Sequence, residues 1–181
     1  DRMHMSEITI CYGMTETSPV IVQSYIDDSI DKRVSTVGHV HPHLEVKIVD
    51  LEGEIVPQGT LGELCVRGYS VMAGYWDEPE KTKEVIDAAG WMHTGDIAEM
   101  DSEGFVKIKG RIKDVVIRGG ENLFPKEIED FLYTHPDVCD VQVIGLPDMR
   151  YGEELCACII LHEHHQSNED SIRSFCKEHI S

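Results

Sequence analysis

The sequence predicts an α+β fold in two parts, and two observations support this prediction. Between residues 8 and 67, short apolar or alternating stretches are broken by glycine and proline, which is typical of a small, strongly bent β-sheet or barrel. Beyond residue 110, strand-like segments alternate with amphipathic helical segments, as in a small α+β domain. A length of 181 residues fits one domain or two small ones, and a hydrophobic content of 41% is enough for a core.

The first part is expected to consist mainly of strands. They are predicted over residues 8–11, 34–40, 44–50 and 63–67. The clearest is the third, where Leu44, Val46 and Ile48 alternate with residues of the opposite face, as in a half-buried strand. Strands this short, separated by Pro57, Gly59 and Gly62, favour a bent sheet.

One helix and one hairpin complete this part. The helix is expected over residues 78–88, because Pro79 stands in its first turn with acids nearby, and Gly90 follows its end. The hairpin is expected to pair residues 96–100 with 105–109. Gly104 suits its turn, because glycine readily adopts positive φ angles.

The second part is expected to mix strands and helices after a boundary at residues 111–114. Strands are predicted over residues 115–117, 138–144 and 154–161, with a sharp turn at Gly119 and Gly120. A helix is predicted over residues 125–133, opened by Pro125. Asn168 is a good N-cap residue and predicts a last helix with Ile172 and Phe175 inward.

Charge and cysteine content restrict the classes of partner. With 34 acidic against 16 basic residues the formal net charge is -18, which argues against nucleic acid and anionic membranes. No apolar run approaches the roughly 20 residues that span a bilayer. The six cysteines are expected to be reduced, buried thiols, because Cys11 and Cys65 stand in apolar runs and Cys156 and Cys158 share one strand face. A reducing, intracellular compartment follows.

Residues 12–16 carry the first chemical signal. Thr15 and Glu16 lie on a turn after a strand, where a hydroxyl can donate to a phosphate and a carboxylate can hold Mg²⁺. Tyr12 could supply an aromatic plate. The structural alternative is a capping threonine, a solvated glutamate and a core tyrosine.

Asp96 and Arg111 carry the second signal. A carboxylate accepts two donors side by side, which suits a vicinal diol such as that of ribose. The planar guanidinium of Arg111 suits paired oxygens. The alternative is an ordinary surface ion pair.

Taken in this order, residues 12–16, 94–96 and 110–114 resemble the signature motifs of the adenylate-forming (AMP-binding) superfamily. Residues 62–68 and 72–76 resemble the acyl-CoA synthetase branch, most closely the mitochondrial medium-chain acyl-CoA ligases. The resemblance implies that residues 1–110 are the C-terminal part of the large AMP-binding domain. Residues 111–114 would then be a hinge, and residues 115–181 a truncated small C-terminal domain.

The resemblance also implies roles for single residues. Tyr12 would stack on adenine, with Gly13 and Thr15 also at the nucleotide and Glu16 on the metal. Asp96 and Arg111 would hold the ribose. Lys113 would be the hinge residue, and Gly119 and Gly120 would line the path of the coenzyme A pantetheine. His93 departs from the pattern, because many members carry Arg or Lys there, and this leaves open whether position 93 contributes a cation.

The implied reaction joins a fatty acid to coenzyme A with ATP and Mg²⁺, through an acyl-adenylate, and releases AMP and pyrophosphate. The family's phosphate loop would precede Tyr12 and its catalytic lysine would follow Ser181, so we expect an internal piece that is inactive alone. Two alternatives stay open: an adenylation domain that loads a carrier protein, and a non-catalytic nucleotide-binding module if the chain is complete. The expected location is the mitochondrial matrix in a eukaryote and otherwise the cytoplasm.

Overall fold

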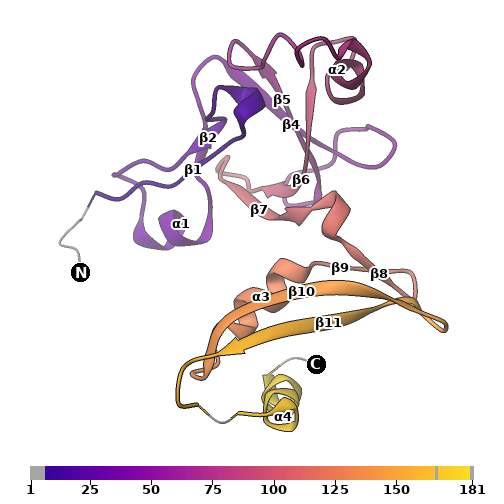
Figure 1. Ribbon diagram of the computed structural model, residues 1–181. Helices are drawn as coiled ribbons and strands as arrows, with labels where there is room; N and C mark the ends of the chain where they lie inside the picture. The colour runs from indigo at the N-terminus through magenta and orange to yellow at the C-terminus, as the bar shows by residue number, and fades with distance from the viewer. Residues whose placement is uncertain (1–6, 166, 180–181) are drawn as a thin grey trace. The chain divides into compact units, whose positions relative to one another are not determined.

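A computed structural model describes residues 7–165 and 167–179 of the protein. The chain divides into two compact units, Asp1–Ile112 and Lys113–Ser181 (Figure 1). The division falls inside the segment 111–114 that the sequence analysis assigned to a hinge, and each unit is described by itself. The described residues contain no helix that is both long and apolar enough to cross a membrane.

The first unit begins with a three-stranded antiparallel sheet of very short strands. They are β1 (Cys11–Tyr12), β2 (Val22–Gln23) and β3 (His39–Val40), in that order. The turn after β1 forms a 3₁₀ helix, η1 (Thr15–Thr17), and helix α1 (Ile30–Ser35) precedes β3. This sheet places Tyr12 at the start of the turn that carries Thr15 and Glu16.

A four-stranded antiparallel meander forms the second sheet of the first unit (Figure 1). Its strands are β4 (Leu44–Val49), β5 (Gly62–Gly68), β6 (Met92–Met100) and β7 (Val106–Arg111), with helix α2 (Pro79–Val85) between β5 and β6. The backbone N–H of Val37 donates to the Val106 carbonyl, and the N–H of Val106 donates to the Gly38 carbonyl, both at 2.9 Å. These bonds attach the edge strand β7 to the segment that leads into β3.

One apolar core lies between the two sheets. Its fully buried members come from both of them and include Val22 of β2, Leu64 and Val66 of β5, and Met92 of β6. Tyr12 is partly buried and packs against this core. The strand that ends in Tyr12 is therefore held against the strands that carry Asp96.

Among its described residues, the second unit has one antiparallel sheet and two α-helices. Its elements are η2 (Ile112–Asp114), which starts at the division, then β8 (Val116–Arg118), β9 (Glu121–Leu123), α3 (Pro125–Leu132), β10 (Val138–Asp148), β11 (Gly152–Leu161) and α4 (Glu169–His179). The strand order is β10-β11-β8-β9. Leu132 of α3 and Ile172 of α4 pack on the sheet residues Val141, Val143 and Ile159.

Two side-chain contacts of the second unit fix local structure. The Ser171 N–H donates to Asn168 Oδ1 at 3.0 Å, so Asn168 caps α4 as its residue type predicted. The Val143 N–H of β10 donates to Glu129 Oε1 of α3 at 2.9 Å. The second bond ties the helix to the outer strand of the sheet.

The sequence-based prediction of a strand over residues 34–40 is wrong in its first half. Residues 30–35 form α1, and only His39 and Val40 are in a strand. The missed signal is Ser29, whose Oγ accepts the N–H of Lys32 as an N-cap. Val34 is 72% exposed, so the apolar residue that suggested a buried strand lies on a solvated helix face.

The strand predicted over residues 8–11 is also shorter than expected. Only Cys11 and Tyr12 are in β1, and Ile8 and Ile10 are 45% and 40% exposed. β1 is an edge strand that pairs with β2 alone. An apolar run therefore did not mean a buried strand here.

All six cysteines are free, as predicted, but the expectation that they are buried holds only for Cys65. Cys11 is exposed because it lies on the edge strand β1. Cys158 is exposed because the core contacts of β11 are made by Leu155 and Ile159, on the opposite face. The alternation of side chains along a strand correctly placed Cys156 and Cys158 on the same face of β11. The prediction that this face is the buried one was wrong.

Candidate functional site

Asp96 is the centre of the candidate site in the first unit. It lies on β6, directly opposite Arg111 of β7 in the register, and its side chain is only 12% exposed. Arg111 Nε lies 3.4 Å from Asp96 Oδ1, and the Tyr12 hydroxyl donates to Asp96 Oδ2 at 2.6 Å. Two residues that the sequence analysis assigned to the nucleotide, Tyr12 and Arg111, thus converge on the carboxylate of a third, Asp96.

The Tyr12 hydroxyl remains protonated at neutral pH. Burial raises the pKa of Tyr12 far above its usual range, and the hydrogen bond to Asp96 raises it further. A carboxylate has about four lone-pair sites, so each oxygen of Asp96 can accept another donor beside its present partner. The arrangement can hold Tyr12, Arg111 and a pair of ligand hydroxyls together.

The stretch of β6 before Asp96 is fixed by residues that the sequence analysis did not assign to the site. Thr94 Oγ1 donates to the Leu64 carbonyl at 2.7 Å and accepts the Asp96 N–H at 3.1 Å. Glu63 Oε1 accepts the Gly95 N–H at 3.0 Å. The sequence did contain a clue to these contacts. Motifs 62–68 and 94–96 were both recognised, and the fold places them on neighbouring strands.

The turn that follows Tyr12 requires glycine at position 13. A Cβ on Gly13 would lie 1.8 Å from the carbonyl oxygen of Pro19, which no side chain tolerates. The buried Thr17 closes the turn, since its Oγ1 accepts the Met14 N–H at 3.0 Å and donates to the Met14 carbonyl. Thr15 is left exposed on the resulting η1 turn.

Glu16 is anchored by the segment that leads into α2. The Tyr75 hydroxyl donates to Glu16 Oε1 at 2.9 Å, which raises the pKa of Tyr75, and the Met72 N–H donates to the Glu16 carbonyl at 2.8 Å. Sequence reasoning used residues 72–76 only as a family signature and missed Tyr75. One anchored carboxylate fits Mg²⁺, which proteins often bind through one or two carboxylates together with substrate phosphates.

The remaining predicted residues belong to the second unit. Lys113 lies in η2 and is exposed. Gly119 and Gly120 form the turn between β8 and β9 with φ angles of 60° and 91°, and the Gly119 N–H donates to the Tyr151 carbonyl at 2.9 Å. Their expected roles at the hinge and the coenzyme A path stay predictions.

The antiparallel sheets and the carboxylate held by a tyrosine and an arginine agree with the resemblance to adenylate-forming enzymes. A family model described as AMP-binding enzyme matches residues 1–76, and one described as AMP-binding enzyme C-terminal domain matches residues 127–181. The chain belongs to the AMP-binding enzyme family.

Relatives in this family include acyl-CoA ligases. The chain is 50% identical to a mitochondrial medium-chain acyl-CoA ligase, ACSF2, of Bos taurus, and 50% identical to the putative acyl-CoA synthetase YngI of Bacillus subtilis. Both matches cover the whole chain, but it spans only 30% and 33% of these proteins. Among solved structures, ATP-bound MatB from Rhodopseudomonas palustris matches 96% of the chain at 34% identity with a TM-score of 0.89, over 34% of its own length.

Proposed function

We propose that the first unit binds the nucleoside half of ATP and that the chain serves an AMP-forming acyl-CoA synthetase. The observation that carries the proposal is the Asp96 carboxylate held between Tyr12 and Arg111. Asp96 would accept both ribose hydroxyls while the Tyr12 ring lies against adenine. Arg111 would add a donor and offset the charge of the carboxylate.

Gly13, Thr15 and Glu16 would act at the phosphates. The close backbone approach that Gly13 permits would bring the Thr15 hydroxyl to a phosphate oxygen. Glu16, oriented by Tyr75, would hold Mg²⁺, which neutralises phosphate charge when bound. A carboxylic acid is a poor electrophile, so holding these charges is what allows AMP to leave from an acyl-adenylate.

The second unit would serve the thioester half-reaction with coenzyme A. The positive φ angles of Gly119 and Gly120 leave their turn without side chains, so a pantetheine chain could approach its backbone closely. Lys113, exposed on a single 3₁₀ turn, has the freedom that a hinge residue needs. The two relatives named as acyl-CoA enzymes favour free coenzyme A over a carrier protein as acceptor.

The cellular location is proposed from the cysteines and from a relative. Six free thiols and the mitochondrial name of the bovine relative favour a reducing compartment. This would be the mitochondrial matrix in a eukaryote and the cytoplasm otherwise. A fatty acid is the proposed acyl substrate.

Nucleotide discrimination tests the ribose assignment on the 181-residue chain. Calorimetric titration in the presence of Mg²⁺ should show tighter binding of ATP than of 2′-deoxy-ATP. Asp96→Asn should weaken ATP binding by about 1.5–3 kcal/mol, roughly 10- to 100-fold, and remove the discrimination. Glu99→Gln, a change on the same strand at a residue paired with Lys107, is the control and should change neither. Equal affinities for the two nucleotides in the unaltered chain would reject the assignment.

The chain alone is expected to give no fatty-acid-dependent ATP–pyrophosphate exchange. Its 181 residues contain no Ser/Thr/Gly-rich phosphate loop with a lysine, and loss of one preorganised donor typically costs about 10²–10³ in rate. Exchange above background that disappears in Glu16→Ala would contradict this expectation.

A further inference from the structure

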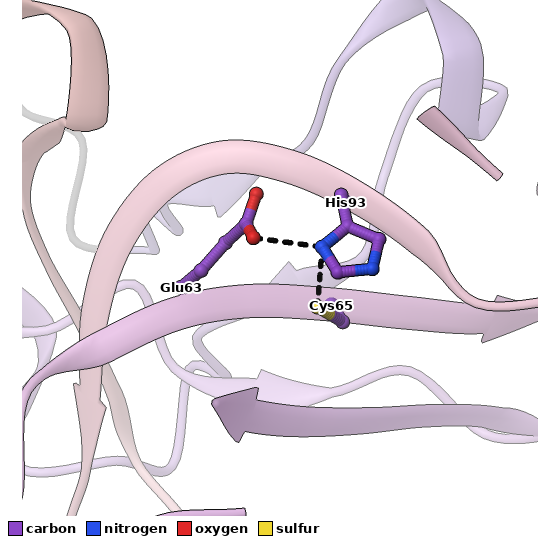
Figure 2. A group of neighbouring side chains, drawn as sticks. All are labelled: Glu63, Cys65 and His93. Carbon is purple, nitrogen blue, oxygen red and sulfur yellow. Dashed lines mark hydrogen bonds and ion pairs between the residues drawn. The ribbon is translucent and has the colours of Figure 1, made fainter. Parts of the chain in front are cut away.

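Three metal-ligating side chains converge on one face of the strand pair β5–β6. Cys65 and His93 are directly opposite each other in the antiparallel register, and Glu63 stands two residues before Cys65 on the same strand. The register shifts between Glu63 and Cys65, where one residue of β5 stands opposite residues 94–96 of β6. Figure 2 shows the three side chains pointing toward one another, and one ligand atom from each lies within 4.8 Å of the other two.

The distances suit a small tetrahedral metal ion. Cys65 Sγ lies 3.5 Å from His93 Nδ1. Zinc–sulfur and zinc–nitrogen bonds of about 2.3 and 2.1 Å at a tetrahedral angle place these two atoms about 3.6 Å apart, close to the observed distance. Glu63 Oε2 lies 2.7 Å from the same nitrogen, a hydrogen-bond distance, and a metal would require about 3.3 Å. The Glu63 side chain is 19% exposed and can supply this opening by rotation.

We propose that Glu63, Cys65 and His93 form a binding site for a divalent transition-metal ion of the Zn²⁺ class, with water as the fourth ligand. The ion takes the place of the proton shared by His93 and Glu63 and of the thiol proton of Cys65. His93, which is 34% exposed on its side chain, gives the ion access from solvent.

The donor set selects the class of ion. One sulfur, one imidazole nitrogen and one carboxylate oxygen suit Zn²⁺ or Co²⁺, whereas Mg²⁺ and Ca²⁺ prefer oxygen ligands alone. This site is therefore distinct from the proposed Mg²⁺ ligand Glu16. Burial raises the pKa of the Cys65 thiol to about 12, with Glu63 adding to the effect, so the thiol releases its proton only to a strongly bound ion.

The neighbouring charges leave room for a cation. Lys47 lies opposite Cys65 in the β4–β5 register, but its Nζ is placed over the Trp91 ring, 4.8 Å from the ring centroid. Arg67 covers the same ring at 4.5 Å and pairs with Glu45. Arg67 is therefore balanced by an acid, and the charge of Lys47 near Cys65 is opposed by the charges of Glu63 and Asp87.

Metal binding at this place would cross-link β5 and β6 just before Asp96. Glu63 holds the Gly95 N–H through Oε1 and His93 through Oε2, so an ion replaces only the second contact. The site requires no nucleotide, and its test is independent of the proposed ATP binding.

Titration of the 181-residue chain with Co²⁺, in a phosphine reductant, tests the site. We expect one equivalent to bind with thiolate-to-metal charge transfer in the near ultraviolet and with visible bands of tetrahedral intensity. Zn²⁺ should displace Co²⁺ and remove these bands, whereas excess Mg²⁺ should not. Glu63→Gln and His93→Ala should weaken binding at least tenfold, and Cys65→Ser should abolish the charge-transfer band. Cys158→Ser, at an exposed thiol, should leave all signals unchanged.

A second readout guards against misfolding of the buried Cys65→Ser variant. Both tryptophans, Trp76 and Trp91, lie in the first unit, so fluorescence reports its unfolding. One equivalent of Zn²⁺ should raise the unfolding midpoint of the unaltered chain and not that of His93→Ala, a change at a partly exposed side chain. Absence of a charge-transfer band in the unaltered chain, or its survival in a folded Cys65→Ser variant, would overturn the proposal.

Discussion

The two units position their candidate functional residues by different means. In the first unit, Tyr12 and Asp96 are 84 positions apart in the sequence and meet through strand pairing and core packing. In the second unit, Gly119 and Gly120 owe their conformation to one turn between adjacent strands. The first arrangement depends on long-range packing, and the second on the local φ angles of two residues.

This difference predicts how substitutions will act. A change at the first site should disturb unfolding and nucleotide binding together, because the same contacts serve both. A change in the second unit should cost only local strain and leave nucleotide binding unaffected. Four substitutions test the distinction, in order of decreasing expected effect.

Gly13→Ala should have the largest effect. Its Cβ would overlap the Pro19 carbonyl oxygen, so the turn must open, at a cost of about 3 kcal/mol in the free energy of unfolding of the first unit. Urea unfolding followed by tryptophan fluorescence measures this cost, and calorimetry should show weaker ATP binding. Gly53→Ala is the control: its φ of 83° costs about 1 kcal/mol, and no atom lies within 4 Å of the added Cβ. Equal losses in the two variants would contradict the steric account.

Tyr12→Phe should cost about 2 kcal/mol, because a hydrogen bond to a charged carboxylate is lost while the ring stays. The effect should depend on pH. Since the folded state raises the pKa of Tyr12, the stability that its neutral form contributes is present below about pH 10, the unfolded value, and is lost as pH rises above it.

The measurement compares free energies of unfolding of the two proteins between pH 8 and pH 11. The unaltered chain should lose stability faster above about pH 10 than Tyr12→Phe, because the raised pKa of Tyr12 is absent from the variant. Parallel pH profiles of the two proteins would show that the pKa of Tyr12 is the same in the folded and the unfolded chain. Burial would then not raise the pKa of Tyr12.

Gly120→Ala should cost about 1 kcal/mol, confined to the second unit. Its φ of 91° strains an L-residue, but no atom lies within 4 Å of the added Cβ. Amide hydrogen exchange should show faster opening of β8 and β9, with unchanged tryptophan-detected unfolding of the first unit. A loss of ATP affinity would break the distinction between the two units.

Lys113→Ala should have the smallest effect, below about 0.5 kcal/mol, because the side chain is exposed on η2. Urea unfolding and hydrogen exchange of both units should match the unaltered chain. A loss above 1 kcal/mol would show that Lys113 supports the fold, and would weaken its assignment to a hinge.

The sequence predicted most elements because their signals are local. The alternation of Leu44, Val46 and Ile48 gave β4, and Asn168 gave the start of α4. Residues 30–35 were missed because Val34 looked like part of a strand, and only the Ser29 cap indicates the helix. The exposure of Cys158 could not be predicted, since period 2 groups residues on a face without saying which face the helices cover.

The sequence predicted the residues of the candidate site but not the residues that hold them in position. Tyr12, Asp96 and Arg111 were assigned to one nucleotide from their motifs, but the hydrogen bond between Tyr12 and Asp96 was not foreseen. Glu63 and Tyr75 were overlooked because each acts through a residue far away in the sequence. Such contacts depend on strand register, which no single motif contains.

The contact between Glu129 and β10 has a consequence for behaviour at high concentration. β10 is an edge strand of 11 residues, and a long edge offers unpaired amides to a second molecule, which invites aggregation. Here Glu129 occupies the Val143 N–H and Asp140 Oδ1 accepts the Val141 N–H at 2.9 Å, while Pro147 has no N–H to offer. Glu129 of helix α3, together with Asp140 and Pro147 of β10 itself, therefore protects this edge of the sheet against growth by strand addition.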